Sequence, residues 1–277
     1  MGKILIKPKS LEQLKMIINK DIDGIILSVD KLSVNASFYI DILFLDQFDF
    51  GKKNVFISLN KLMHNSDLEH LRDVMHKLKN KDVKILFYDL AVYRIAKEYD
   101  MVDKLVVYQD HLNASNLSNK FYEHIGVSGS YVTSDITLDE LLEIKDNSNL
   151  DIYFTVYGYL PIFYSRRLLV TNYLKYINSN FGENYKILSD MGKEYIIQEE
   201  GEGTTIYTEM PVNLINYLDK LDKIDYLVMD SNNIQNDEFN NMIDKFIKKD
   251  RIDDVYTGFI DKKTIYKVKN GAGDKNE

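Results

Sequence analysis

Short runs of consecutive apolar residues alternate along the chain with longer stretches in which apolar positions recur every three or four residues. The runs are rich in Ile, Val, Leu and Tyr, which is typical of strands buried on both faces. The longer stretches show the spacing of one helix face, as at Leu11, Leu14, Ile17 and Ile18. The pattern predicts eight strands, at residues 3–7, 24–29, 55–59, 84–88, 104–108, 130–133, 152–156 and 226–229.

The starts of several helices are indicated by capping residues. A Ser or Thr with Gln or Glu three residues later forms a capping box, and three such pairs occur, Ser10–Gln13, Ser66–Glu69 and Thr137–Glu140. We interpret the aromatic-rich residues 35–50 as a helix, and residues 212–221 and 239–249 as the last two helices. Residues 116–124 are predicted to be helical as well.

Strands that alternate with helices argue for parallel βαβ units, and their number argues for a closed ring. The predicted fold is therefore α/β, a TIM-barrel-like (β/α)8 barrel with a small antiparallel insertion after the seventh unit. We expect residues 1–183 to form units one to seven, 184–209 the β-rich insertion and 210–250 the last unit. Residues 251–277 are expected to form a C-terminal strap and a disordered tail.

The seventh unit contains the most unusual stretch of the chain. Between its predicted strand and helix lies GYLPIFYSRR, residues 158–167, which we interpret as a turn at the mouth of the barrel. It ends in the adjacent Arg166 and Arg167, which are poor core residues but suit phosphate or carboxylate. The alternative is that both arginines pair with neighbouring acidic side chains.

Composition limits the chemistry. Lys and Arg number 35 against 43 Asp and Glu, a net charge of −8, so the surface as a whole does not attract nucleic acid. The chain has no cysteine, which excludes disulfides and thiolate-bound iron–sulfur or zinc sites. No run of residues approaches the roughly 20 apolar positions of a membrane span. We expect a cytoplasmic protein with no membrane association.

Polar residues follow the predicted strands, where a parallel barrel places its working groups. Each one could instead cap a helix or form a turn. The set is Lys7, Asn60, Asp89, Asp110, Ser134, Asp135, Tyr157 and Asp230.

The usual catalytic signatures are absent. The five histidines form no HExxH motif, and only His111, after the fifth strand, stays a candidate. Ser165 lacks the glycines of a hydrolase nucleophile elbow. Glu199, Glu200 and Glu202 could bind a hard cation or form a solvated acidic turn. We expect no bound metal.

The segment GYLPIFYSRRLL, residues 158–169, resembles the hallmark of peptidase family U32, the collagenase-like proteins, which usually reads close to HGALCxSYSGRCL. Gly158, Tyr164, Ser165 and Arg167 match. The likeness extends along most of the chain, through KPKS at 7–10, Asn60 after the third strand, SDITLDELLEI at 134–144, GTTIYTEMPVNLINYL at 203–218 and the GF and KTIYKVK pieces at 258–269.

The resemblance implies a barrel related to the TIM type. Some family members are described as peptidases, and others act in oxygen-independent hydroxylation, including formation of 5-hydroxyuridine at the tRNA wobble position with prephenate implicated. Related members hold an iron–sulfur centre through cysteines at the positions of Pro161 and Leu168 and near Asn213. Those ligands are absent here, so we expect no such cofactor. Short members of this kind resemble chains that act in related pairs.

The leading hypothesis is a role in prephenate-dependent 5-hydroxylation of wobble uridine in tRNA, as one chain of a paralogous U32 pair. The alternatives are a collagenase-like protease, which would be a hydrolase, or a non-catalytic partner subunit of a related chain. Arg167 and then Arg166 are the first candidates to bind prephenate, a similar small anion or RNA phosphate, and Tyr164 and Tyr157 could stack on a base or ring. The other candidates are Ser165, Asn60, Asp110 and Asp230.

Overall fold

Eight parallel strands form a closed barrel in the computed structural model, which describes residues 2–109, 112–179, 185–188, 192, 194–200 and 203–262. Around the ring the strands follow the order β1, β14, β8, β7, β6, β5, β4, β2, and pairing of β1 with β2 closes it. The predicted fold class is confirmed. The strands are β1 (Lys3–Lys7), β2 (Gly24–Val29), β4 (Asn54–Leu59), β5 (Lys84–Phe87), β6 (Leu105–Tyr108), β7 (Gly129–Tyr131), β8 (Asp151–Gly158) and β14 (Tyr226–Asp230).

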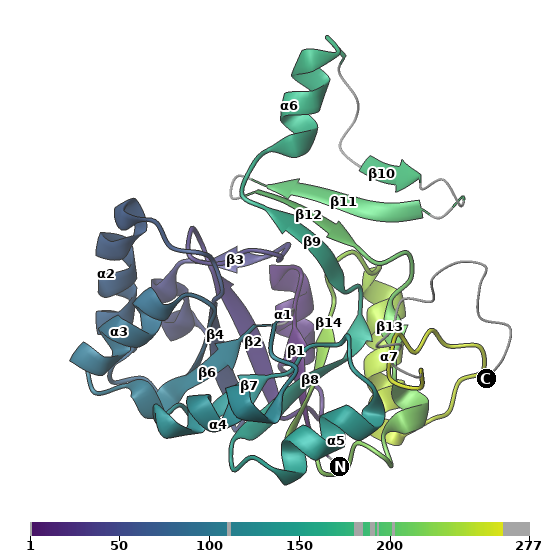
Figure 1. Cartoon of the computed structure of the whole chain (residues 1–277), viewed down its shortest axis with the longest axis horizontal. Coiled ribbons are helices and arrows are strands. Elements are labelled where there is room, and N and C mark those ends of the chain that lie inside the picture. The colour runs from purple at the N-terminus through teal and green to yellow at the C-terminus, as the bar shows by residue number, and fades with distance from the viewer. Residues whose placement is uncertain are drawn as a thin grey trace, which may run out of the picture.

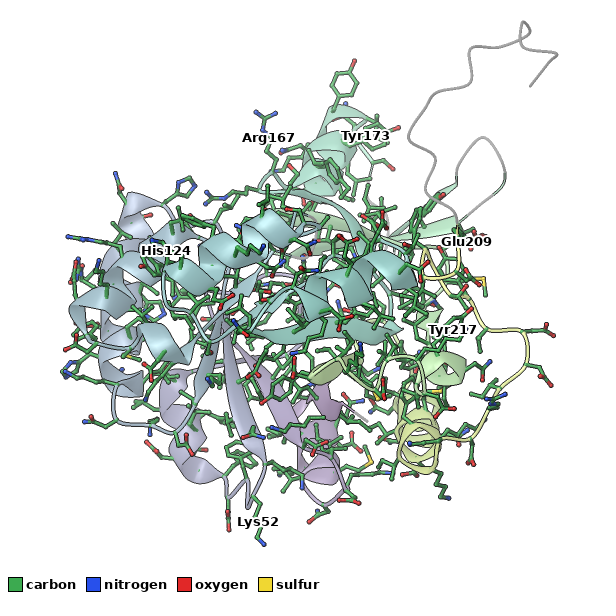
Figure 2. The ribbon with its side chains drawn as sticks, turned by 60° about the horizontal axis from the view of Figure 1, so that its bottom comes forward. Lys52, His124, Arg167, Tyr173, Glu209 and Tyr217 are labelled. Atoms are coloured by element: carbon green, nitrogen blue, oxygen red, sulfur yellow. The ribbon has the colours of Figure 1, made fainter. Side chains whose placement is uncertain are left out.

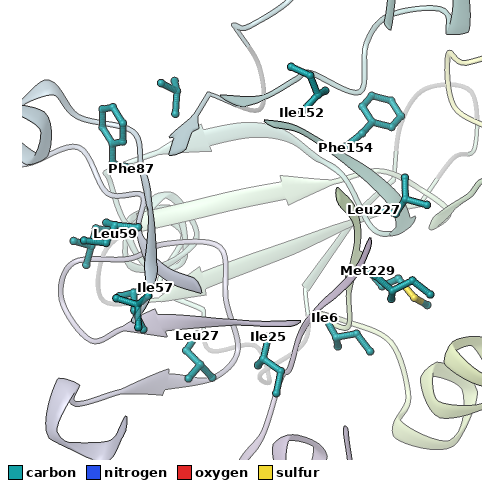
Figure 3. Close-up of a cluster of buried hydrophobic side chains, with 14 of the residues drawn as sticks. Ile6, Ile25, Leu27, Ile57, Leu59, Phe87, Ile152, Phe154, Leu227 and Met229 are labelled. Atoms are coloured by element: carbon teal, nitrogen blue, oxygen red, sulfur yellow. The ribbon is translucent and has the colours of Figure 1, made fainter. Parts of the chain in front are cut away.

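Helices cover the outside of the barrel (Figure 1). Alternate strand residues, such as Ile25, Leu27, Ile57 and Leu59, point outward from the ring into a buried apolar layer (Figure 3). This alternation explains why each strand reads as a continuous apolar run, because both of its faces are buried. The covering helices are α1 (Leu11–Ile17), α2 (Leu68–Leu78), α3 (Leu90–Glu98), α4 (Asn116–His124), α5 (Leu138–Asp146) and α7 (Asn236–Lys248).

The inside of the barrel is filled with aromatic side chains. Tyr153 and Tyr226 stack with ring centroids 4.4 Å apart, and Phe56 meets both rings edge-on. Leu5 and Ile26 belong to the same buried cluster. The barrel is therefore a packed core, and the place to look for a functional site is the end of the barrel where the strands finish.

A second, antiparallel sheet contains the predicted insertion. Its strand order is β10 (Tyr185–Leu188), β11 (Glu194–Glu200), β12 (Gly203–Tyr207) and β9 (Pro161–Ser165), and α6 (Leu169–Tyr176) follows β9. The prediction of a turn over residues 158–167 is wrong, because Pro161–Ser165 pairs with β12 as a strand. Figure 1 shows α6 projecting from this sheet, away from the barrel.

Two segments predicted to be helical differ from the prediction. Residues 35–50 contain a two-residue strand, β3 (Tyr39–Ile40), and a 3-10 helix, η1 (Ile42–Gln47). The phenylalanines of this segment pack on one another, as Phe44 and Phe48 do at 4.5 Å between ring centroids, so they need no regular helix face. Residues 212–221 form β13 (Val212–Asn213), which pairs with the end of β8, and η4 (Ile215–Tyr217).

The capping predictions are mixed. Thr137 and Glu140 form the predicted capping box of α5. Ser10 accepts a hydrogen bond from the Gln13 amide as predicted, but the Gln13 side chain accepts from Lys9. The box predicted at Ser66 and Glu69 is wrong, because the turn η2 (Asn65–Asp67) starts earlier. There Asp67 accepts a hydrogen bond from the His64 amide at 2.7 Å.

The remaining described segments are short. The 3-10 helix η3 (Val102–Lys104) precedes β6. Residues 251–262 are described, whereas the rest of the predicted C-terminal strap and all of the predicted disordered tail lie outside the described residues. Among the helices that the structure describes, none combines the length and apolar character needed to cross a membrane.

Candidate functional site at the barrel mouth

A buried ion pair lies where β1 and β14 end. The two strands run parallel with Lys7 opposite Asp230, and Lys7 Nζ lies 2.8 Å from Asp230 Oδ2. Lys7 is only 8% exposed, and its ammonium group also donates to the carbonyl oxygen of Asn35. Asp230 accepts a further hydrogen bond from the Asn232 amide at 2.9 Å. The ion pair thus links the ends of β1 and β14 at the barrel mouth.

A pocket of about 420 Å³ opens beside this ion pair, and we call it the mouth pocket. Three carboxylates, Asp135, Glu209 and Asp230, reach it, and no lysine, arginine or histidine is among its described lining residues. Its walls are otherwise largely aromatic, formed by Tyr108, Tyr131, Tyr159, Tyr195, Tyr256 and Phe259. Such a lining suits a flat, ring-shaped group, whereas a dicarboxylate would meet like charge.

Two of the tyrosines come from inward-facing ends of barrel strands. Tyr108 ends β6 and Tyr131 ends β7, and their rings meet edge-on with centroids 4.6 Å apart. The Tyr131 hydroxyl lies 2.6 Å from the Thr155 hydroxyl on β8, so hydrogen bonding fixes the ring. These residues were missed as site candidates because a tyrosine at the end of an apolar run reads as core.

A smaller pocket of about 290 Å³ lies next to the mouth pocket, and we call it the β9 pocket. The two pockets share Tyr108 and Ile162, so β9 passes between them. Asn60, Tyr88 and Tyr164 also line the β9 pocket. Asn60 is buried and holds the loop after β2, because its amide group exchanges two hydrogen bonds with the backbone of Val34.

The second sheet is attached to the barrel mouth by a polar network. Glu200 on β11 accepts hydrogen bonds from the Tyr39 hydroxyl and from Gln198. Burial raises the pKa of Glu200 above its usual range, and the same cause raises the pKa of Tyr39. Asn232, after β14, donates to Gln198 at 3.0 Å and to the buried hydroxyl of Tyr207 at 2.9 Å. The network joins β11 and β12 to the ends of the barrel strands.

The structure brings some of the predicted site residues together. Asp230 lines the mouth pocket, and so do Ser134 and Asp135 from the strand-end set. Asn60 and Tyr164 line the β9 pocket. All five residues therefore lie around the mouth, and the strand-end rule had named all of them except Tyr164, which came from the segment at residues 158–167.

Other candidates are not among the described residues that line the two pockets. Tyr157 points outward to Phe239 and Phe246 on α7, and its hydroxyl donates to Glu238 at 3.3 Å. Asp89 caps α3 by accepting from the Ala91 amide, which is the structural alternative considered for the strand-end residues. Asp110 and His111 lie outside the described residues.

The two arginines also lie away from the mouth. Ser165 ends β9, and Arg166 and Arg167 follow it in the bend before α6. Neither arginine lines the mouth pocket or the β9 pocket. Figure 2 shows Arg167 at the outer edge of the molecule. The shared pocket expected for the arginines is absent from this part of the described chain, because β9 carries them past the barrel opening.

The glutamates considered as a cation site face different neighbours. Glu199 accepts hydrogen bonds from the amides of Val170 and Thr171 at the start of α6, at 2.7 and 2.9 Å, and from the hydroxyls of Thr171 and Thr204. Burial raises the pKa of Glu199, but these bonds outweigh it and hold that pKa below the usual range. Glu200 faces Tyr39 instead, and Glu202 lies outside the described residues.

The described residues contain no cluster of potential metal ligands. No group of three or more His, Asp or Glu side chains among these residues is placed to hold a metal ion. The positions of the family's cluster cysteines do not fit an iron–sulfur group either. Pro161 and Leu168 carry no ligand atom in their side chains, and the Asn213 amide contacts the Met242 sulfur at 3.6 Å.

Comparison with known proteins gives the relationship. The family model described as Peptidase family U32 matches residues 9–262. The chain is also similar to the protein named tRNA hydroxylation protein P2 of Bacillus subtilis (strain 168), with 26% identity over 176 residues. That match covers 60% of this chain and 57% of the relative, so it spans little more than half of either protein. No solved structure matches the chain. The chain belongs to peptidase family U32.

Proposed function

We propose that this protein acts in the hydroxylation of tRNA, at C5 of the wobble uridine. The observation that carries the proposal is the likeness to a relative named for tRNA hydroxylation. The mouth pocket supports it, because its tyrosine walls and volume of about 420 Å³ suit a nucleobase turned out of its stack.

The proposal includes prephenate as a co-substrate and a paralogous U32 chain as a partner. Replacing the C5 hydrogen by a hydroxyl group is a two-electron oxidation, so it needs both an oxygen source and an oxidant, and prephenate is the co-substrate that the family resemblance implies. The described lining of the mouth pocket carries carboxylates and no cation, so a dianion would need a cationic group from elsewhere. A partner chain is one possible source of that cationic group, and a second reason supports its inclusion. The cysteines that bind an iron–sulfur centre in related members are absent here.

No observation favours the peptidase alternative. Peptide hydrolysis needs an activated nucleophile or a metal-bound water. Ser134 reaches the mouth pocket, but no histidine or lysine lies among the described lining residues to activate it.

The test is mass spectrometry of tRNA nucleosides from a strain that lacks this gene. We expect 5-hydroxyuridine derivatives to disappear and to return when the wild-type gene is supplied. An unchanged level in the deletion strain would refute the proposal.

A variant at Tyr108 tests the pocket itself. Tyr108→Leu removes the aromatic face that both pockets share, whereas Tyr108→Phe keeps it. Removing one stacking ring weakens base binding by about 1–3 kcal/mol. We therefore expect the Leu variant to restore less of the modification than the Phe variant does. Equal restoration by both would remove the mouth pocket from the proposal.

A further inference from the structure

The helix α6 exposes an unusual combination of side chains. Tyr173 and Tyr176 are 61% and 85% exposed, and none of the helix's residues is buried. Residues three apart lie on the same helix face, so the two rings stand side by side on the outside. Figure 2 shows Tyr173 and Arg167 together at the outer edge of the molecule. Exposed tyrosines in such a place have no packing role in the described structure.

The charge of this segment is opposite to that of the whole chain. Between Asp151 and Glu183 there is no acidic residue, whereas Arg166, Arg167 and Lys175 are basic. The chain as a whole has eight more acidic than basic residues. Arg167 and Lys175 are exposed, and neither forms an ion pair with any described residue. The positive charge at α6 is thus available to a partner.

The helix is held in place despite its exposure. Glu199 accepts from the amides of Val170 and Thr171, and Thr204 accepts from the Leu169 amide at 2.9 Å. These contacts fasten the start of α6 to the second sheet. They also occupy the amides that an anion would otherwise bind at a helix start. A polyanion must therefore be bound by the side chains, which are the basic groups and the tyrosines.

We infer that α6 and the bend before it form a docking surface for the tRNA. This inference rests on the proposed function, because it names where the substrate of that reaction is held outside the mouth pocket. Exposed tyrosines can stack on unpaired bases, while Arg167 and Lys175 neutralise phosphates. The segment has no acidic residue of its own to repel the RNA backbone, and the nearby Glu199 carboxylate is occupied by hydrogen bonds from Val170, Thr171 and Thr204.

RNA fits this surface better than a protein partner does. Tyr and Arg are common in protein interfaces too, so the discriminating features are Lys175, a residue type depleted there, and a positive charge with no acidic residue from 152 to 182 to balance it. Here the most exposed rings lie among basic side chains on a helix with no neighbouring carboxylate in sequence. Base stacking together with phosphate contacts requires this mixture.

The test measures binding of an unmodified tRNA transcript to the full chain by fluorescence anisotropy at several salt concentrations. Tyr173→Ala with Tyr176→Ala removes both rings, and Arg167→Gln with Lys175→Gln removes two charges. The matched controls alter exposed residues on other helices. They are Leu117→Ala with Phe121→Ala on α4, and Arg94→Gln with Lys97→Gln on α3.

We expect the tyrosine pair to weaken binding by roughly tenfold or more at fixed salt. The arginine–lysine pair should lower the slope of log Kd against log salt by about 2, one for each phosphate that is no longer neutralised. Both control pairs should bind like wild type. Since α6 has no buried residue, circular dichroism should show unchanged folding.

Three results would overturn the inference. They are wild-type protein that does not bind the transcript, α6 variants that bind like the controls, and α6 variants that bind tRNA normally but lose a co-purifying protein. Nucleoside analysis of the deletion strain separates these failures from failure of the proposed function. If the deletion removes the modification while the α6 variants bind normally, the function stands and the docking surface does not.

Discussion

At the scale of single residues, the strand-end rule found part of the site. Asp230, Ser134 and Asp135 lie in the mouth pocket because parallel strands deliver their last residues to one opening. The rule could not find Tyr108 or Tyr131, whose aromatic rings continue an apolar run. It also placed Tyr157 at the mouth. The Tyr157 side chain instead points outward to Phe239. The pairing of β8 with β14 shifts register at this point, between Val228 and Met229.

The ion pair at the mouth gives the first stability prediction. Asp230→Asn leaves the Lys7 ammonium buried without its carboxylate, and breaking a buried pair in this way costs about 3–5 kcal/mol. Asp230 is itself about one-fifth exposed, so we expect the lower end of that range. Urea unfolding followed by circular dichroism measures the loss.

Two further variants serve as controls for the ion pair. Asp146→Asn breaks the exposed pair with Lys223, at 2.9 Å, and should shift the urea midpoint little, because exposed pairs contribute little. Replacing both partners, Lys7→Met with Asp230→Asn, should recover part of the stability. If Asp230→Asn proved as stable as Asp146→Asn, the buried pair would not be what holds the strand ends together.

At the scale of elements, the sequence predicted all eight barrel strands. Each strand is buried on both faces, so it appears in the sequence as a continuous apolar run. It misread β9, whose pairing partner β12 lies about 40 residues further along the chain. Local pattern holds no information about such a partner. The helix interpretation of residues 212–221 failed similarly, since pairing of Val212 with Gly158 replaces the first helical turn.

The attachment of α6 can be tested through its first turn. Glu199→Ala removes the carboxylate that accepts from the Val170 and Thr171 amides, so these amides should exchange hydrogen faster. Hydrogen–deuterium exchange with mass spectrometry resolves the peptide that contains them. Glu140→Ala is the reciprocal control, because Glu140 accepts from the Thr137 amide in the capping box of α5. It should speed exchange at α5 and leave α6 unchanged.

Unchanged protection of α6 in Glu199→Ala would contradict the attachment seen in the structure. The rigidity that limits the entropy α6 would lose on binding RNA would then have a source other than Glu199.

At the scale of the whole molecule, the barrel and the second sheet meet through groups that sequence patterns do not reveal. Tyr39 lies in a segment that we interpreted as a helix, and Glu200 in a turn that we considered as a cation site. Their hydrogen bond joins the two sheets at the barrel mouth. Buried polar contacts between distant segments depend on the tertiary fold alone, so the barrel and the antiparallel insertion could be predicted while the contacts that join them could not.

Glu200 should make the stability of the molecule depend on pH. Burial raises its pKa in the folded state above the ordinary value of about 4.3, so the folded state retains this proton to higher pH than the unfolded chain does. The contribution of Glu200 to stability is therefore largest below about pH 4.3. It declines as pH rises through the raised folded value and is constant above it. Glu200→Gln cannot ionise and should lack this decline.

Urea midpoints measured from pH 4 to pH 8 test this prediction. Glu200→Gln should match wild type near pH 4 and exceed it at pH 8, since the neutral amide can still accept from Tyr39. Glu143→Gln, which removes an exposed carboxylate on α5, controls for the change in net charge. A Glu200→Gln midpoint below wild type at pH 8 would mean that the ionised carboxylate is needed to hold the second sheet on the barrel. The pH dependence would then reverse, because loss of that charge at low pH would weaken the attachment of the second sheet to the barrel.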